Sequence, residues 1–252
     1  FLLQPFFPSA DYFFSFNSPS WSLGCEQLFY FCFPLIVPFL HTKRSLFITL
    51  LICLPIMLAG MYLTNEEQIK AYWYVNPFTR LPDFFVGVLL YQFYRSLCNK
   101  KLFYSTGTLL EAGAVALFLL FFLCAADIPK VYRYSCYYWL PVSLIILIFA
   151  LQQGGISRLL SNRFLIIGGE ISYSFYLIHL FIIDTYMQMS AHYHWQIQWT
   201  ISVPVILCIT IILSLLSFYY FEKPANKWVK RIFTKKTIIN QPHGIINKNT
   251  AN

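Results

Sequence analysis

Seven apolar runs occupy most of the sequence, and their lengths restrict what the chain can fold into. A helix that crosses the hydrocarbon core of a bilayer needs about 20 predominantly apolar residues, and most of these runs approach that length. Hydrophobic residues make up 58% of the chain and charged residues only 11%, unlike the composition of soluble domains. We therefore predict an all-α fold, a polytopic membrane helix bundle whose seven spans cover residues 24–40, 46–63, 81–94, 106–126, 138–152, 164–184 and 199–221.

The basic residues between these runs predict the orientation of the bundle. Alternate connections, together with residues 222–236, carry thirteen lysines and arginines, whereas the other connections carry four. Cytoplasmic loops are enriched in Lys and Arg, so we predict a multi-pass protein of the plasma (inner) membrane with a cytoplasmic C-terminus. The net charge of +8 is spread over these connections, which argues against nucleic acid as a partner and favours the lipid bilayer. The seven cysteines have no metal-ligand spacing, and no metal site is predicted.

The run ISYSFYLIHLFII, from Ile171 to Ile183, carries a histidine inside an apolar segment. In a helix, Ser172, Tyr176 and His179 share one face because positions i, i+4 and i+7 stack. An ionisable side chain inside a membrane helix is costly, so His179 is a candidate functional residue. The alternative is a structural histidine that hydrogen-bonds to a neighbouring helix.

Three further ionisable residues are predicted at the same extracytoplasmic depth as His179. Glu26 lies at the outer start of the first predicted span, and Arg80 and Asp83 lie at the outer start of the third. Pairing across a polar cavity is the least costly arrangement for such groups. A carboxylate beside an imidazole also favours general-base chemistry on a hydroxyl. The alternative is that Glu26, Arg80 and Asp83 are ordinary residues at the level of the lipid headgroups.

The chain contains the segments WSLGCEQLFYFCFP, RLPDFFVG, GEISYSFYLIH and YFEKP. Together and in this order, they resemble four sequence elements of membrane acyltransferase family 3. WSLGCEQLFYFCFP, from Trp21 to Pro34, resembles the family element WSLsvEeqFYl.fPl. The other three are RLPDFFVG (80–87), which resembles R.peFllG, GEISYSFYLIH (169–179), which resembles G.iSYslYLwH, and YFEKP (220–224), which resembles yyiEkP. The four segments are spread over about 200 of the 252 residues, and this combination makes the resemblance specific.

The resemblance implies an integral membrane O-acyltransferase. Such enzymes take an acyl group, usually acetyl, from acetyl-CoA supplied by the cytoplasm. They transfer it to a hydroxyl of a cell-surface polysaccharide, such as lipopolysaccharide, or of a related glycan. No tightly bound cofactor is expected. On this basis we assign Glu26, Arg80 and His179 to catalysis, and to the substrate pocket we assign Trp21, Tyr30, Asp83, Ser172, Tyr173 and Tyr176.

The family is described as ten spans with both termini in the cytoplasm, which implies that three spans precede residue 1. The first of these is expected to carry an arginine and a histidine that are central to catalysis. We predict that residues 1–238 form the membrane acyltransferase domain and that 239–252 are a polar, disordered cytoplasmic tail. The chain departs from the family motifs at Gln27, Leu28 and Ile178, whereas Glu26 and His179 are kept.

Two other interpretations remain open at the level of sequence. A transporter or flippase for a glycan or a lipid-linked precursor is compatible with buried charges and interrupted helices. An inverted repeat with paired, interrupted spans would favour it, and the sequence contains none that we can identify. The other interpretation is an inactive fragment of the acyltransferase.

Overall fold

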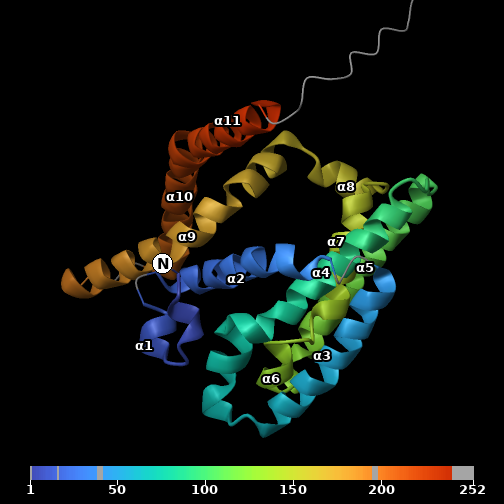
Figure 1. The fold of residues 1–252 in the computed structure, drawn as a ribbon. Coiled ribbons are helices and arrows are strands. Elements are labelled where there is room, and N and C mark those ends of the chain that lie inside the picture. Colours follow the sequence, from blue (N-terminus) through green and yellow to red (C-terminus); the bar gives the residue numbers. More distant parts are fainter. Residues whose placement is uncertain (1, 16, 39–41, 195–197, 240–252) are drawn as a thin grey trace, which may run out of the picture. The chain divides into compact units, whose positions relative to one another are not determined.

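The computed structural model confirms an all-α chain (Figure 1). It describes residues 2–15, 17–38, 42–194 and 198–239, with the backbone alone at 234–239. Within these ranges every regular element is a helix. The chain divides into two compact units, residues 1–166 (unit 1) and 167–252 (unit 2), which are described one at a time below. Apart from Ile239, the predicted polar tail lies outside the described residues.

Each predicted span coincides with a helix. These helices are α2 (Trp21–Ile36), α3 (Lys43–Leu63), α4 (Pro77–Leu97), α5 (Tyr104–Cys124), α7 (Trp139–Leu151), α9 (Arg163–His192) and α10 (Trp199–Ser217). The remaining α-helices are α1 (Ala10–Phe13), α6 (Lys130–Arg133), α8 (Gly155–Leu160) and α11 (Lys223–Ile239). Four 3-10 turns are η1 (Gln4–Phe6), η2 (Ser18–Ser20), η3 (Glu66–Gln68) and η5 (Ala125–Asp127). Two π-helices are η4 (Lys70–Val75) and η6 (Phe218–Glu222). The last two residues of the first predicted span lie outside the described ranges.

Four stretches of the described chain are long and apolar enough to cross a membrane. They are Lys43–Leu63, Tyr104–Asp127, Arg163–His192 and Trp199–Phe233. Two of the other predicted spans are short, because α2 has 16 residues and α7 has 13, against the roughly 20 that a bilayer requires. The third, α4, has 21 residues but is less apolar, since it carries Arg80, Asp83 and Arg95.

Helix α4 is the central element of unit 1. It packs against α2, α3 and α7, and α7 packs in turn against α5. Its start is defined by Asn76, whose Oδ1 accepts a hydrogen bond from the N–H of Phe78 at 2.9 Å, and by Pro77 at the first helical position. The helix therefore begins at residue 77 rather than at the predicted residue 81, and its first two turns include Arg80 and Asp83.

A buried carboxylate joins α5 to the short helix α8. The side chain of Glu111 is 1% exposed. Its Oε1 accepts a hydrogen bond from the N–H of Gly154 at 3.0 Å, and its Oε2 accepts from Ile156 at 2.8 Å and Ser157 at 3.1 Å. A Cβ built on Gly154 would lie 2.3 Å from the Glu111 carboxylate, so the close approach requires glycine there.

Unit 2 consists mainly of α9, α10 and α11. Helix α10 continues through the π-helix η6 into α11, and η6 packs against both. Two side-chain hydrogen bonds join α9 to this segment, one between Tyr186 and Ser202 at 2.5 Å and one between Ser174 and Glu222 at 2.5 Å.

Candidate functional site

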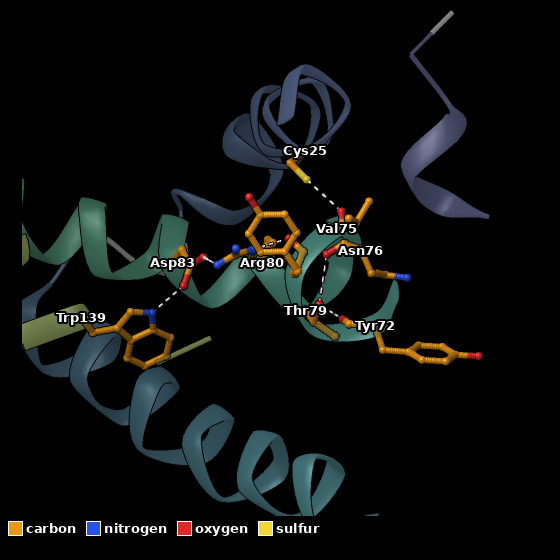
Figure 2. A network of polar contacts seen from close by, with 9 residues as sticks. Cys25, Tyr72, Val75, Asn76, Thr79, Arg80, Asp83 and Trp139 are labelled. Atoms are coloured by element: carbon orange, nitrogen blue, oxygen red, sulfur yellow. Dashed lines mark hydrogen bonds and ion pairs between the residues drawn. The ribbon is translucent and has the colours of Figure 1, made fainter. Parts of the chain in front are cut away.

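A charged cluster between α4 and α7, termed the Arg80 cluster, consists of Arg80, Asp83 and Trp139 (Figure 2). Arg80 Nη1 donates a hydrogen bond to Asp83 Oδ2 at 3.0 Å, and Trp139 Nε1 donates to the other carboxylate oxygen at 2.5 Å. No other salt bridge occurs in the described part of the chain. The side chains of Arg80 and Asp83 are 19% and 32% exposed, so the ion pair is shielded but open to a ligand.

The guanidinium of Arg80 lies over the aromatic rings of Tyr74 and Trp21. Its central carbon lies 5.6 Å from the ring centroid of Tyr74 and 6.0 Å from that of Trp21, within the range of cation–π attraction. The two rings contact each other, with centroids 4.8 Å apart, and Tyr74 also contacts Tyr134 at 5.0 Å. A guanidinium carries five N–H donors, and hydrogen bonds to described residues occupy two of them.

The π-helix η4 provides the backbone framework of this site. Its carbonyl groups accept hydrogen bonds from side chains of neighbouring elements, because a π-helix that ends after six residues leaves carbonyls without helical partners. Arg80 Nε donates to the carbonyl of Tyr74 at 2.9 Å, and the Cys25 thiol donates to that of Val75 at 3.4 Å. The Thr79 hydroxyl donates to the carbonyl of Tyr72 at 2.5 Å, and Figure 2 shows this contact and the Cys25–Val75 contact.

A cavity of about 280 Å³ adjoins the Arg80 cluster. Its lining includes the polar side chains of Asp83, Trp139 and Ser143, together with apolar residues of α4 and α7 such as Val86 and Ile146. A small pocket with a few convergent polar groups is the usual form of a binding site.

The turn before α7 carries a cysteine, Cys136, that lies within electrostatic reach of Asp83. Burial raises the pKa of the Cys136 thiol above its ordinary value, and the negative charge of Asp83 acts in the same direction. The protonated form of this cysteine is therefore favoured, and a thiolate nucleophile is disfavoured.

The other residues assigned to the site in unit 1 have different environments. Trp21 packs beside Tyr74, as described above, and belongs to the Arg80 surroundings. Glu26 follows the buried Cys25 on α2 but is itself exposed, and no described residue lies within ion-pair distance of it. Tyr30 lies one turn further along α2 and is 70% exposed. The structure thus brings Arg80, Asp83 and Trp21 together and leaves Glu26 and Tyr30 outside this set of contacts.

In unit 2, His179 lies on α9, and one nitrogen of its ring, Nδ1, hydrogen-bonds to the backbone of the same helix. Nδ1 lies 2.6 Å from the carbonyl oxygen of Tyr176 and 3.3 Å from that of Phe175. A carbonyl can only accept, so Nδ1 donates, and in the neutral ring Nε2 carries the lone pair. In this tautomer, Nε2 is the nitrogen that can accept a proton.

The tyrosines and serine assigned to this motif are accessible. Tyr173 and Tyr176 are exposed, and so is Ser172, whose hydroxyl donates to the Gly169 carbonyl of its own helix at 2.7 Å. Ser172, Tyr176 and His179 lie on one helix, as the sequence predicts, and at positions that share a face.

Sequence reasoning missed two contacts between distant residues. The first is Trp139 to Asp83, 56 residues apart, and the second is Ser174 to Glu222, 48 residues apart. Ser174 is 2% exposed and lies on the opposite face of α9 from His179, since five helical steps of about 100° separate the two residues by about 140° around the helix axis. Glu222 ends η6 in the segment YFEKP, so this hydrogen bond joins two of the four motif segments.

The chemistry available at these residues is hydrogen bonding and charge stabilisation. Arg80 presents a fixed cation with unoccupied N–H groups, which suits an oxygen that gains negative charge in a transition state. His179 presents a basic nitrogen, which suits removal of a hydroxyl proton. In the ranges that the structure describes, no group of three or more His, Cys, Asp or Glu side chains is placed to hold a metal ion.

Comparison with known proteins identifies several relatives. O-acetyltransferase OatA of Staphylococcus aureus (strain NCTC 8325 / PS 47) is 28% identical over 221 residues, which are 82% of this chain and 36% of OatA. Acyltransferase MdmB of Streptomyces mycarofaciens is 27% identical over 202 residues, covering 72% of this chain and 49% of MdmB. YrhL of Bacillus subtilis (strain 168), whose name assigns it provisionally to peptidoglycan O-acetylation, is 26% identical over 257 residues, covering 93% of this chain and 39% of YrhL.

The chain spans less than half the length of each of these three relatives. Comparison with solved structures gives no match. The family model described as an acyltransferase domain matches residues 1–219, which include three of the four motif segments in full. The chain therefore belongs to acyltransferase family 3.

Proposed function

We propose that this protein is an integral membrane O-acyltransferase that transfers an acetyl group from acetyl-CoA to a hydroxyl of a cell-surface glycan. The observation that carries the proposal is the family match over residues 1–219, which includes the segment that builds the Arg80 cluster. Relatives named as O-acetyltransferases support the acetyl group. The same match favours an acyltransferase over a transporter or flippase.

In the proposed reaction, the acceptor hydroxyl oxygen forms a bond to the acetyl carbonyl carbon and the carbon–sulfur bond of the thioester breaks. The hydroxyl proton passes to a base and then to the departing thiolate of CoA. Arg80 stabilises negative charge on the acetyl oxygen through its unoccupied N–H groups. His179 accepts the proton of the acceptor hydroxyl through Nε2.

Supporting roles follow from the contacts of the neighbouring residues. Asp83, held by Trp139, fixes the plane of the Arg80 guanidinium. We propose that Trp21, Tyr30, Ser172, Tyr173 and Tyr176 contact the acceptor, and that Glu26 pairs with a cationic or hydroxyl group that reaches its exposed carboxylate.

The proposed orientation follows the distribution of basic residues. It places the C-terminus and the connections that contain Lys43, Arg95 and Arg158 in the cytoplasm, and it places the Arg80 cluster toward the outer face of the plasma membrane. Thiol labelling of single cysteines placed at Lys100 and at Glu67 in intact cells tests this orientation. Labelling by an impermeant reagent at Glu67 alone is expected, and labelling at Lys100 alone would contradict it.

The proposed function is tested by the O-acetyl content of surface glycan in cells that express the intact gene with His179→Ala, Glu26→Gln or no substitution. His192→Ala is the matched control, because it removes a histidine from the exposed last position of the same helix. We expect acetylation with the unsubstituted gene and the control, and its loss with His179→Ala. Undiminished acetylation in both site variants would contradict the site assignment, and no acetylation with the intact gene would support an inactive protein.

A further inference from the structure

A second and larger cavity lies between α2, the start of α3 and residues 84–96 of α4. Its volume is about 930 Å³, within the range of small-molecule sites. Phe33 and Val37 of α2 and Phe84 and Val88 of α4 form apolar walls. Lys43, Arg95 and Ser96 lie at the other end, and we call this the α2–α4 cavity.

The polar end of the α2–α4 cavity carries two cations and no acid. Lys43 Nζ donates a hydrogen bond to Ser96 Oγ at 2.5 Å and lies 4.9 Å from the centroid of the Phe93 ring, so its ammonium is held at the mouth. No described carboxylate lies within ion-pair distance of Lys43 or Arg95, and neither Asp nor Glu lines the cavity. A pair of uncompensated cations beside an apolar cavity fits a ligand with phosphate groups at one end and an uncharged arm.

The cavity also extends toward the Arg80 cluster. From Arg95 to Phe84 it follows eleven residues of α4, about 16 Å at the helical rise of 1.5 Å per residue. Phe84 is the residue next to Asp83. Gly87 lines both this cavity and the smaller one beside Asp83, and a Cβ built there meets no atom within 4 Å. A ligand anchored at the mouth would therefore direct its far end toward the charged pair.

We propose that the α2–α4 cavity binds the acyl donor, with Lys43 and Arg95 on the phosphate groups of CoA and its thioester arm along the wall formed by Phe84 and Val88. This inference rests on the proposed function and deepens it, since it names the residues that hold the donor. The same phosphate chemistry is offered by membrane phospholipids, and the experiment has to separate the two sources.

The test measures binding of labelled acetyl-CoA to the purified full chain in a neutral detergent, with acetyl-pantetheine, which lacks the phosphate groups, as a second ligand. We expect the double variant Lys43→Gln/Arg95→Gln to weaken acetyl-CoA binding by about tenfold or more and to leave acetyl-pantetheine binding unchanged. Lys100→Gln/Lys101→Gln is the matched control, because it removes two exposed cations from the connection that follows α4 and leaves the cavity intact. Gly87→Leu, which changes no charge, should weaken both ligands.

Three outcomes decide the inference. Unchanged acetyl-CoA affinity in the Lys43/Arg95 variant, with thermal unfolding equal to that of the unsubstituted protein, would overturn it. If the Lys43/Arg95 variant loses binding of phosphatidylglycerol while its affinity for acetyl-CoA is unchanged, the cavity is a lipid site and the inference is also overturned. Failure of the unsubstituted protein to bind acetyl-CoA at all would instead overturn the proposed function, and the donor site with it.

Discussion

Two carboxylates of unit 1, Glu111 and Asp83, lie on helices of the same bundle and differ in almost every contact. Glu111 is 1% exposed and receives three backbone N–H hydrogen bonds at the start of α8, without a cation. Asp83 is 32% exposed, pairs with Arg80, receives an indole N–H and borders a cavity. Each carboxylate is satisfied, but only Asp83 is satisfied in a way that leaves a charged partner open to a ligand.

This difference shows that depth of burial does not by itself locate a functional site. A carboxylate enclosed by backbone donors stabilises the junction of two helices and has no lone pair accessible to a substrate. A partly open ion pair holds a cation in one orientation while unused N–H groups remain. The two carboxylates should therefore respond in opposite ways to substitution, one in stability and the other in activity.

The largest effect is expected at Glu111. Glu111→Ala removes the acceptor of three buried N–H groups, so the free energy of unfolding should fall by about 3 kcal/mol. Thermal unfolding in detergent measures it. Glu111→Gln, which keeps one carbonyl oxygen for the same donors, is the comparison and should lose less. If Glu111→Ala unfolds like the unsubstituted protein but loses acyl transfer, the contrast with Asp83 is wrong.

Arg80→Gln should show the reverse pattern. Removing the cation proposed to stabilise the acetyl oxygen should lower acyl transfer roughly a hundredfold, while the midpoint of thermal unfolding changes little because the pair is partly solvated. Arg80→Lys keeps the charge but loses the planar set of donors, and it should recover only part of the activity. Activity assays with labelled acetyl-CoA and unfolding curves on the same preparations separate the two effects. A large loss of stability in Arg80→Gln would place Arg80 with Glu111 as a structural residue.

The helices were predictable because apolar run length and helical rise relate directly to the bilayer, and each predicted span is a helix. The pairing of Arg80 with Asp83 is also local, since residues three apart face each other on a helix. The start of α4 was missed by four residues, although Asn76 and Pro77 are a recognisable helix start.

What could not be predicted depends on contacts between distant segments. Trp139 reaches Asp83 across 56 residues, and Glu111 reaches Gly154 across 43, so neither leaves a pattern in the local sequence. From sequence Glu111 is an ordinary charge near the start of a helix. Only the packing of α7 and α8 against their neighbours distinguishes the two carboxylates.

A smaller effect is expected when the indole donor to Asp83 is removed. Trp139→Phe retains an aromatic ring in the wall of the cavity but loses the Nε1–H, so the carboxylate is held by Arg80 alone. Because Trp139 acts through Asp83 and Arg80, acyl transfer should fall by roughly tenfold through kcat, with the KM for acetyl-CoA unchanged. A change confined to KM would show that Trp139 contributes to binding of the donor rather than to the orientation of Arg80.

The smallest effect is expected in unit 2, where two serines of α9 differ in burial as the two carboxylates of unit 1 do. Ser174 is buried and donates to Glu222, whereas Ser172 is exposed and bonds only to its own helix. Ser174→Ala should lower the free energy of unfolding by about 1 kcal/mol, because Glu222 loses a hydrogen-bond donor. Ser172→Ala should leave the free energy of unfolding unchanged and lower the affinity for the glycan acceptor. Unfolding curves and acceptor KM values for both variants measure this. Equal stability of the two variants would mean that the Ser174–Glu222 contact contributes nothing to the joining of α9 and η6.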